Sequence, residues 1–351
     1  MTSSETKRLY RRLAIEHLEK CEIDPAVRQL VRPKKDVNAY NAIAAAISKM
    51  RRDFEPVTKQ DWGGKQQFDE TEVIVLSDLH FGKKVIIEGQ VVFDKAIAEE
   101  RFKAIAAGMR HLNESYIRPN HSIDELVILM VGDTLDGELI YEGQVYNQDM
   151  PLLDQLTFSS QLIKKELINP ASQTFGTVRV ISVPGNHGEI RNERKDHMMH
   201  PRTNFDTILA LMLQIGCQNL KNVSFEIATT TLHTTMIRNW KFLLAHNLPC
   251  AGDSSFRKKY GGLFERFRFD VSVHGHRHTP ELTYFNTKPV LQNGSLPGVD
   301  DYSIELAFNT VPTQLLFTVS DKRPIALLFQ VDVGHRTKEA EVRETIDREG
   351  E

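Results

Sequence analysis

Five short apolar runs in this chain each end in a residue that can bind a metal ion. The first run is Val73–Leu76, and Asp78 and His80 follow it directly. A continuous apolar run of this length is typical of a strand that is buried on both faces. Asp78 and His80 are two residues apart, so both side chains point to the same side of an extended chain. Alone, this ending fits either a metal site or an ordinary turn.

The other four runs repeat the pattern. Leu126–Val131 leads into Gly132-Asp133, Val178–Val183 into Gly185-Asn186-His187, Trp240–Ala245 into His246, and Phe269–Val273 into Gly275-His276-Arg277-His278. Ligands bind at the carboxyl ends of strands in open α/β sheets, so we expect these side chains to gather at one edge. Carboxylate, imidazole and carboxamide groups suit divalent metals. Five such endings predict a metal centre rather than five unrelated turns.

Strands and helices alternate in the first part of the chain, whereas strand follows strand in the second part. The helical patterns are Asp94–Leu112, Leu152–Leu167 and Asn204–Ile215, and Lys83–Gln90 is expected to be a connecting loop. The later strand signals are Val223–Ala228, Thr231–Ile237, Pro289–Leu291, Ser303–Phe308, Gln314–Val319 and Ile325–Val333. The pattern predicts an α/β fold (α+β by some schemes) with a core of two packed sheets flanked by helices.

We expect a small helical segment over residues 1–65, a catalytic domain over 66–335 and a charged tail over 336–351. Residues 1–55 carry twelve Lys and Arg and eight Asp and Glu, so this segment is about +4 in a chain of net charge −3. A basic helical unit of this kind is compatible with binding to nucleic acid. It is also compatible with a solvated arm packed on the catalytic domain, which we favour because basic helix faces are common.

The composition, 40% hydrophobic and 26% charged residues, is that of a soluble globular protein. No run approaches the roughly 18 apolar residues of a membrane span. The first residues contain no apolar core of a secretory signal. Cys21, Cys217 and Cys250 are odd in number and far apart, which excludes a disulfide framework. These features predict a cytoplasmic protein that does not interact with a membrane.

The order Asp-x-His, Gly-Asp, Gly-Asn-His, His, Gly-His-x-His resembles the calcineurin-like metallophosphoesterase superfamily over about residues 70–280. The resemblance implies a four-layer metallophosphoesterase fold and hydrolysis of phosphate esters. Two divalent ions about 3.5–4 Å apart hold the attacking hydroxide in this chemistry. We expect Mn²⁺ first, and Fe, Zn, Ni or Mg are also compatible with the ligands.

The resemblance also implies a role for each motif residue. Asp133 would bridge the two ions. The remaining ligands would be Asp78, His80 and His278 for the first ion and Asn186, His246 and His276 for the second. His187 would act with Asp133 in catalysis, as general acid or phosphate stabiliser. Arg277 and Arg191 are candidates to bind substrate. Asp136 is either a residue that supports the site or a plain turn residue.

The sequence departs from the superfamily pattern at two positions, and these departures bear on which branch of the superfamily it resembles. Gly188 stands where the superfamily usually has an acid, and Asp136 lacks the following Arg of the protein Ser/Thr phosphatases, which disfavours that branch. Other stretches are similar to phage- and prophage-encoded, DNA-repair-exonuclease-like members, which implies a bacterial or phage-infected host cell. These stretches are Gly143-Gln144, Asn204-Phe205-Asp206, Asn293-Gly294-Ser295, Asp301-Tyr302 and Pro312-x-Gln314.

The first functional hypothesis is therefore a phosphodiesterase or nuclease acting on nucleic acid or nucleotides. Aromatic and basic residues alternate in Phe256–Arg268, a pattern that stacks and tracks a single strand. The same segment fits an amphipathic helix whose aromatic face lies in the core. The alternatives are a phosphomonoesterase acting on a small molecule or a phosphoprotein, and an inactive metal-binding interaction protein.

Overall fold

The computed structural model describes residues 68–138, 140–189, 203–250, 252–299 and 310–333. All of them belong to the second of two compact units, Gln66–Glu351. The proposed helices of residues 1–65, the tail 336–351, the strand expected at Ser303–Phe308 and Arg191 lie outside the described ranges, so these expectations stay predictions. Within those ranges, every helix is too short or too polar to cross a bilayer.

The larger sheet has six strands in the order β13-β12-β1-β4-β5-β6. Its strands are β1 (Phe68–Leu76), β4 (His121–Val131), β5 (Thr177–Val183), β6 (Val223–Ile227), β12 (Thr313–Ser320) and β13 (Leu327–Asp332). The four strands β1, β4, β5 and β6 are parallel, and β12 runs antiparallel to β1. The carboxyl ends of the four parallel strands therefore share one edge of this sheet.

The second sheet has five strands in the order β10-β11-β9-β8-β7. Its strands are β7 (Leu232–Ile237), β8 (Trp240–Ala245), β9 (Val271–His274), β10 (Glu281–Phe285) and β11 (Lys288–Gln292). Strand β9 pairs in parallel with β8 and with β11, so their carboxyl ends also point one way.

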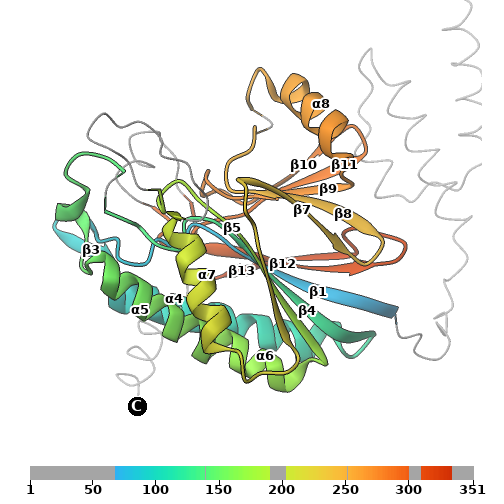
Figure 1. Ribbon diagram of the computed structural model, residues 1–351, viewed down its shortest axis with the longest axis horizontal. Helices are drawn as coiled ribbons and strands as arrows, with labels where there is room; N and C mark the ends of the chain where they lie inside the picture. The colour runs from blue at the N-terminus through green and yellow to red at the C-terminus, as the bar shows by residue number, and fades with distance from the viewer. Residues whose placement is uncertain (1–67, 139, 190–202, 251, 300–309, 334–351) are drawn as a thin grey trace, which may run out of the picture. The chain divides into compact units, whose positions relative to one another are not determined.

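Helices cover the outer face of each sheet (Figure 1). The larger sheet is covered by α4 (Lys95–Leu112), α5 (Leu152–Ile163), α6 (Asn169–Thr174) and α7 (Phe205–Gly216), and the smaller one by α8 (Phe256–Phe267). Asp94 caps α4 by accepting a hydrogen bond from Ile97 N at 2.9 Å. The result is the expected order of helix, sheet, sheet and helix layers.

The continuous apolar run of β1 has a simple cause in these layers. Ile74 and Leu76 pack against the helices, whereas Val73 and Val75 pack against the second sheet. Successive side chains of a strand point to opposite faces, so a strand covered on both faces needs apolar residues at every position. A third apolar cluster lies between the second sheet and α8.

Three local expectations need correction. The segment expected as the loop Lys83–Gln90 contains β2 (Val85–Ile87), which forms a hairpin with β3 (Gln90–Phe93). Its turn is Glu88-Gly89, with both φ angles positive, and a Glu-Gly pair is a weak turn signal compared with Asn-Gly. The helix expected over Leu152–Leu167 is α-helical only to Ile163, and a π-helical turn, Lys164–Ile168, follows. The edge strand β10 was not expected. Four of its five residues are partly or fully exposed, so it lacks the continuous apolar run that marks the buried strands.

The segment Phe256–Arg268 forms the amphipathic helix α8. Phe256 and Tyr260 are buried in the third cluster, and Phe264 packs against it. The aromatic rings therefore lie in the core, which excludes them as a stacking surface for nucleic acid. The basic residues Arg257, Lys258, Lys259 and Arg266 remain exposed on the opposite face.

Candidate metal centre

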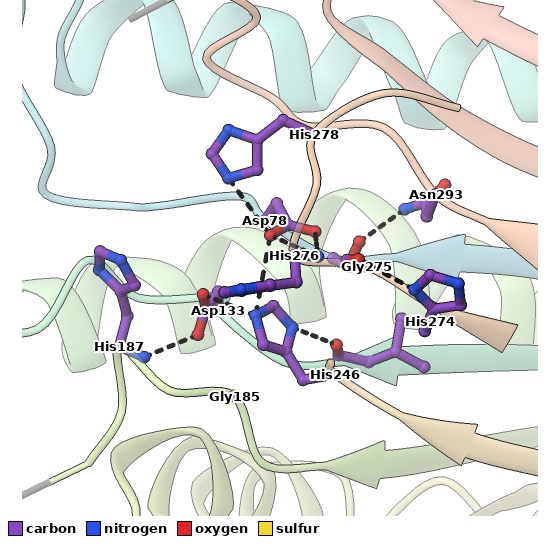
Figure 2. A network of polar contacts seen from close by, with 12 residues as sticks. Asp78, Asp133, Gly185, His187, His246, His274, Gly275, His276, His278 and Asn293 are labelled. Carbon is purple, nitrogen blue, oxygen red and sulfur yellow. Dashed lines mark hydrogen bonds and ion pairs between the residues drawn. The ribbon is translucent and has the colours of Figure 1, made fainter. Parts of the chain in front are cut away.

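The five predicted strand endings meet in one place. Asp78 and His80 follow β1, Asp133 follows β4, Asn186 and His187 follow β5, His246 follows β8, and His276 and His278 follow β9. Figure 2 shows six of these side chains close together: Asp78, Asp133, His187, His246, His276 and His278. The larger sheet supplies the carboxylates and the second sheet supplies three of the imidazoles.

The backbone is strained where the chain leaves these strands. Asp78, His80, Asp133, His276 and His278 have φ angles between 46° and 74°. This left-handed region costs a non-glycine residue about 1 kcal/mol or more and persists only where the surroundings enforce it. Five of the nine such residues in the described ranges are candidate ligands. The strain concentrates at the site because the side chains must be aimed inward from strand ends that run the same way.

The first cluster contains Asp78, His80 and His278. The two Nε2 atoms of His80 and His278 lie 3.1 Å apart, and His278 Nε2 lies 3.4 Å from Asp78 Oδ1. His80 Nδ1 lies 3.3 Å from Asp136 Oδ1, so Nδ1 carries the proton and the Nε2 lone pair faces His278. Lone pairs directed at a common point are the arrangement that a cation stabilises.

The second cluster contains Asp133, His246 and His276. His246 Nε2 lies 2.8 Å from Asp133 Oδ2 and 3.9 Å from Asp78 Oδ1, which links the two clusters. His246 Nδ1 donates to Val131 O at 2.9 Å, so this ring is oriented by the backbone of β4. A second-sheet histidine thus reaches both carboxylates of the first sheet.

The chemistry of the donors fits divalent metal ions. The Asn186 Oδ1 atom is buried and has no hydrogen-bond partner among the described residues, as expected for an amide oxygen that binds a metal. Burial lowers the pKa of both His80 and His276 to about 4, which keeps these imidazoles neutral at pH 7. Burial raises the pKa of Asp78, but His246 and His278 outweigh it and bring the pKa to about 2. Neutral imidazoles and ionised carboxylates are the protonation states that bind metals. His246 differs, because burial lowers the pKa of this imidazole but Asp133 outweighs burial and raises the pKa to about 10, so His246 must release a proton when it binds an ion.

His187 stands beside the two clusters. Its backbone N donates to Asp133 Oδ1 at 2.8 Å, and its ring lies edge-on to His80 with centroids 4.5 Å apart. Its Nδ1 lies 2.8 Å from Asp136 O and 3.4 Å from Asp136 Oδ1. Both are acceptors, so Nδ1 carries a proton and Nε2 is the atom available to a substrate.

Asp136 supports the site and is not a plain turn residue. Its carboxylate is fully buried and lies against both His80 and His187. Gln144 Nε2 donates to its backbone O at 2.7 Å, and Gln148 Nε2 donates to Oδ2 at 3.0 Å. Burial raises the pKa of Asp136, but the bonds from His187 and His80 outweigh it and hold the pKa well below its ordinary value. Asp136 is therefore an anion held in place by four side chains.

Sequence reasoning missed the polar residues that lie behind the ligands. Asp206, Asn293 and Gln314 are buried and hydrogen-bond to the backbone next to Asp133 and Asp78. They had only appeared within stretches of family resemblance. The pattern Asn204-x-Asp206 at a helix start is a capping signal, and it was the only local hint of a buried acid there.

The side chain of Arg277 contacts Asp253 rather than a residue of the two ligand clusters. Its guanidinium lies 3.5 Å from Asp253 Oδ1, and 45% of its side chain is exposed. The imidazole of His274 is buried and faces Gly275 O at 3.2 Å through Nδ1, in keeping with a residue that packs beside the ligands.

Comparison with known proteins gives a family match and a fold match. The calcineurin-like phosphoesterase model matches residues 71–280 of the chain. No relative was found among the curated proteins. Several solved structures match the chain at low identity and low TM-score.

Three of these structures show which kinds of protein match. An archaeal phosphodiesterase is 10% identical, with a TM-score of 0.36, over 75% of this chain and 99% of its own. Vps29 from Entamoeba histolytica, complexed with Zn²⁺, is 15% identical, with a TM-score of 0.31, over 74% and 98%. A hypothetical protein from Pyrococcus horikoshii OT3 is 13% identical, with a TM-score of 0.37, over 79% and 94%. At these scores we draw no functional argument from them.

Proposed function

The chain belongs to the calcineurin-like phosphoesterase family, and on that basis we propose that it is a two-metal phosphodiesterase acting on nucleic acid or nucleotides. The observation that carries the proposal is the pairing of two ligand clusters, Asp78-His80-His278 and Asp133-His246-His276, with a third cluster, His80-Asp133-His187, between them. A single structural metal would not need three overlapping sets.

We assign Asp78, His80 and His278 to one ion and Asn186, His246 and His276 to the other, with Asp133 shared. When bound, two divalent ions neutralise the phosphate charge and activate the attacking water. Two contacts of Asp133 support this assignment: its Oδ2 lies 2.8 Å from His246 Nε2, and its Oδ1 accepts a hydrogen bond from the backbone N of His187. Mn²⁺ is the ion we expect, because the set mixes carboxylate oxygens with imidazole nitrogens.

His187 is assigned the proton transfer. Asp136 holds the Nδ1 side of the ring, so Nε2 is the atom that donates a proton to the oxygen leaving phosphorus. Arg277 lies between two ligands on the same loop, and its exposed guanidinium is available to exchange Asp253 for a substrate phosphate. Arg191 follows the Asn186-His187 segment in sequence and is proposed for the same task.

The substrate class rests on two features. The Arg that follows the second motif acid in protein Ser/Thr phosphatases is absent after Asp136, where Gly137 stands. The exposed basic face of α8 offers a contact for a phosphate backbone. Both favour a diester of nucleic acid over a phosphoprotein. The complete ligand set also opposes the alternative of an inactive binding protein.

The proposal is tested by substrate preference. The purified full-length protein with Mn²⁺ is assayed on bis-p-nitrophenyl phosphate, on p-nitrophenyl phosphate, and on labelled single- and double-stranded DNA. We expect diester and DNA hydrolysis, and none with Asp133→Asn. Hydrolysis of the monoester alone would replace the proposal with a phosphomonoesterase. No turnover with any divalent metal would favour the binding protein.

A further inference from the structure

We propose that the two halves of the metal centre are positioned by two separate polar clamps, so that a change in one clamp weakens the two metal sites to different extents. The α7 clamp consists of Asn204 and Asp206. The amide clamp consists of Asn293 and Gln314. This inference rests on the proposed two-metal function, and neither clamp contains a candidate ligand.

The α7 clamp joins the ends of β4 and β5. Asp206 Oδ2 accepts hydrogen bonds from Asp133 N at 3.0 Å and Gly185 N at 2.9 Å, and Oδ1 accepts from Thr134 N at 3.0 Å. One buried carboxylate thus fixes the backbone of Asp133 and of the residue before Asn186. In our assignment Asn186 is a ligand of the second ion alone, whereas both ions share Asp133.

Asn204 completes the α7 clamp. Its Nδ2 donates to Gly185 O at 2.8 Å, and its Oδ1 accepts from Asp206 N at 2.9 Å, which caps α7 and holds the Asp206 backbone. A Cβ on Gly188 would lie 2.3 Å from Asn204 Oδ1. The glycine that stands after His187, where the family usually has an acid, is therefore required by this clamp.

The amide clamp acts at the end of β1. Gln314 Oε1 accepts from Ser77 N at 3.0 Å, and Gln314 Nε2 donates to Ser77 O at 3.2 Å, so one side chain satisfies both backbone groups of the residue before Asp78. Asn293 Nδ2 donates to Gln314 Oε1 at 2.8 Å and to Ser77 Oγ at 3.0 Å. Asn293 Oδ1 accepts from Leu315 N at 2.9 Å, which ties the clamp to β12.

Both clamps hold a strained backbone in place. Asp78 and Asp133 have φ angles of 52° and 53°, which their own side chains do not favour. Each strained residue persists because buried hydrogen bonds fix the backbone beside it. The clamps hold different strand ends, which three backbone hydrogen bonds join: Asp78 N to Gly132 O and His80 N to Asp133 O, both at 3.1 Å, and Phe81 N to Thr134 O at 3.0 Å. We therefore expect each clamp to act most strongly on its own strand end and to affect the other less.

The test uses binding of Mn²⁺ to the full-length, metal-free protein, measured by calorimetry and by electron paramagnetic resonance, with activity as a secondary readout. The variants are Asp206→Asn and Gln314→Glu, which exchange a carboxylate and an amide of the same shape. Asn186→Ala and His80→Ala report the loss of a ligand to either ion. Glu72→Gln, at a buried carboxylate in the middle of β1, is the matched control and should bind as wild type.

We expect Gln314→Glu to reproduce the isotherm of His80→Ala, with the first site weakened about 10- to 100-fold and the second within about twofold. Asp206→Asn should weaken the second site by a similar factor and the first site less, because both ions share Asp133. Equal weakening of both sites in both variants, or wild-type binding in either, overturns the separate clamps. If a variant does not fold, Asn204→Ala and Asn293→Asp replace it with the same expectations. Wild-type protein that binds fewer than two ions overturns the proposed function instead.

Discussion

The carbonyl oxygen of Asp136 accepts a hydrogen bond from Nδ1 of His187 at 2.8 Å, while its carboxylate lies 3.4 Å from the same nitrogen. One residue therefore holds the proposed proton donor by two groups. Burial excludes water from this contact, so orientation and charge act together.

Asp136→Asn should lower kcat about 100-fold on a diester substrate with little change in KM, because the rings of His187 and of the ligand His80 both lose their anionic partner. Steady-state kinetics across pH 5–9 measures the effect. Glu226→Gln, which removes the acid 2.6 Å from His233 Nε2 on β6 and β7, is the control and should leave kcat unchanged. An unchanged kcat in Asp136→Asn would remove this residue from the reaction.

Gly275→Ala should abolish binding of at least one metal ion. A Cβ at this position would lie 2.3 Å from Asp78 Oδ2 and 2.6 Å from Ser77 Oγ, and both atoms are buried and cannot withdraw. Metal content after dialysis against Mn²⁺ checks the expectation. Gly262→Ala in α8 meets nothing within 4 Å and should instead raise stability by about 1 kcal/mol. Full metal content in Gly275→Ala would contradict the packing.

Metal removal should lower the melting temperature. Without ions, Asp78 and Asp133 are buried anions in close proximity, and binding stabilises the native state by RT ln(1 + [L]/Kd), about 2.7 kcal/mol at 100 times Kd. Differential scanning calorimetry with Mn²⁺, and with a chelator, measures the difference. Asp133→Asn should melt at the same temperature in both buffers. If the melting temperature of the wild-type protein does not change with the chelator, the proposed metal centre is contradicted.

Glu72→Gln should stabilise the protein at pH 8 but not at pH 4. Burial raises the pKa of Glu72 from 4.5 to about 7, outweighing the hydrogen bond that Asn113 donates to it. The native state therefore keeps a proton that the unfolded chain releases. That stabilisation is complete below pH 4.5 and is lost as pH rises through 7. The variant removes the cost of the charge, on the order of 3 kcal/mol.

Urea unfolding of both proteins at pH 4, 6 and 8 gives the comparison. The difference in unfolding free energy between variant and wild type should grow with pH across this range. A difference that is constant with pH would mean that Glu72 ionises normally in the folded protein.

Charge reversal on α8 should weaken binding of DNA. In the variant Lys258→Glu with Lys259→Glu, two exposed cations become anions while the buried aromatic face stays intact. The slope of log affinity against log salt should become shallower by about 0.7 for each lost phosphate contact on a single strand. Lys221→Glu changes an exposed lysine elsewhere and serves as control. An unchanged slope would show that the basic residues of α8 do not contact the DNA.

The residues of the metal centre were predictable because each lies directly after an apolar run. An apolar run is a local signal, since a strand covered on both faces has no polar position, and parallel strands bring their carboxyl ends together. Asp78, Asp133, Asn186, His246 and His276 could be placed at one edge on that ground alone. Their residue types then indicated a metal, and the order of the motifs indicated the family.

The sequence by itself determined the layer order, the strand ends and the types of ligand, since these depend on local hydrophobic patterning. Only the tertiary structure decided the left-handed backbone at Asp78 and Asp133, the buried face of α8 and the supports behind the ligands. Asp206 contacts Asp133 across 73 residues, and Gln314 contacts Ser77 across 237. Hydrogen bonds between segments so far apart leave no periodic trace in the chain, because they depend on which strand ends the fold brings together.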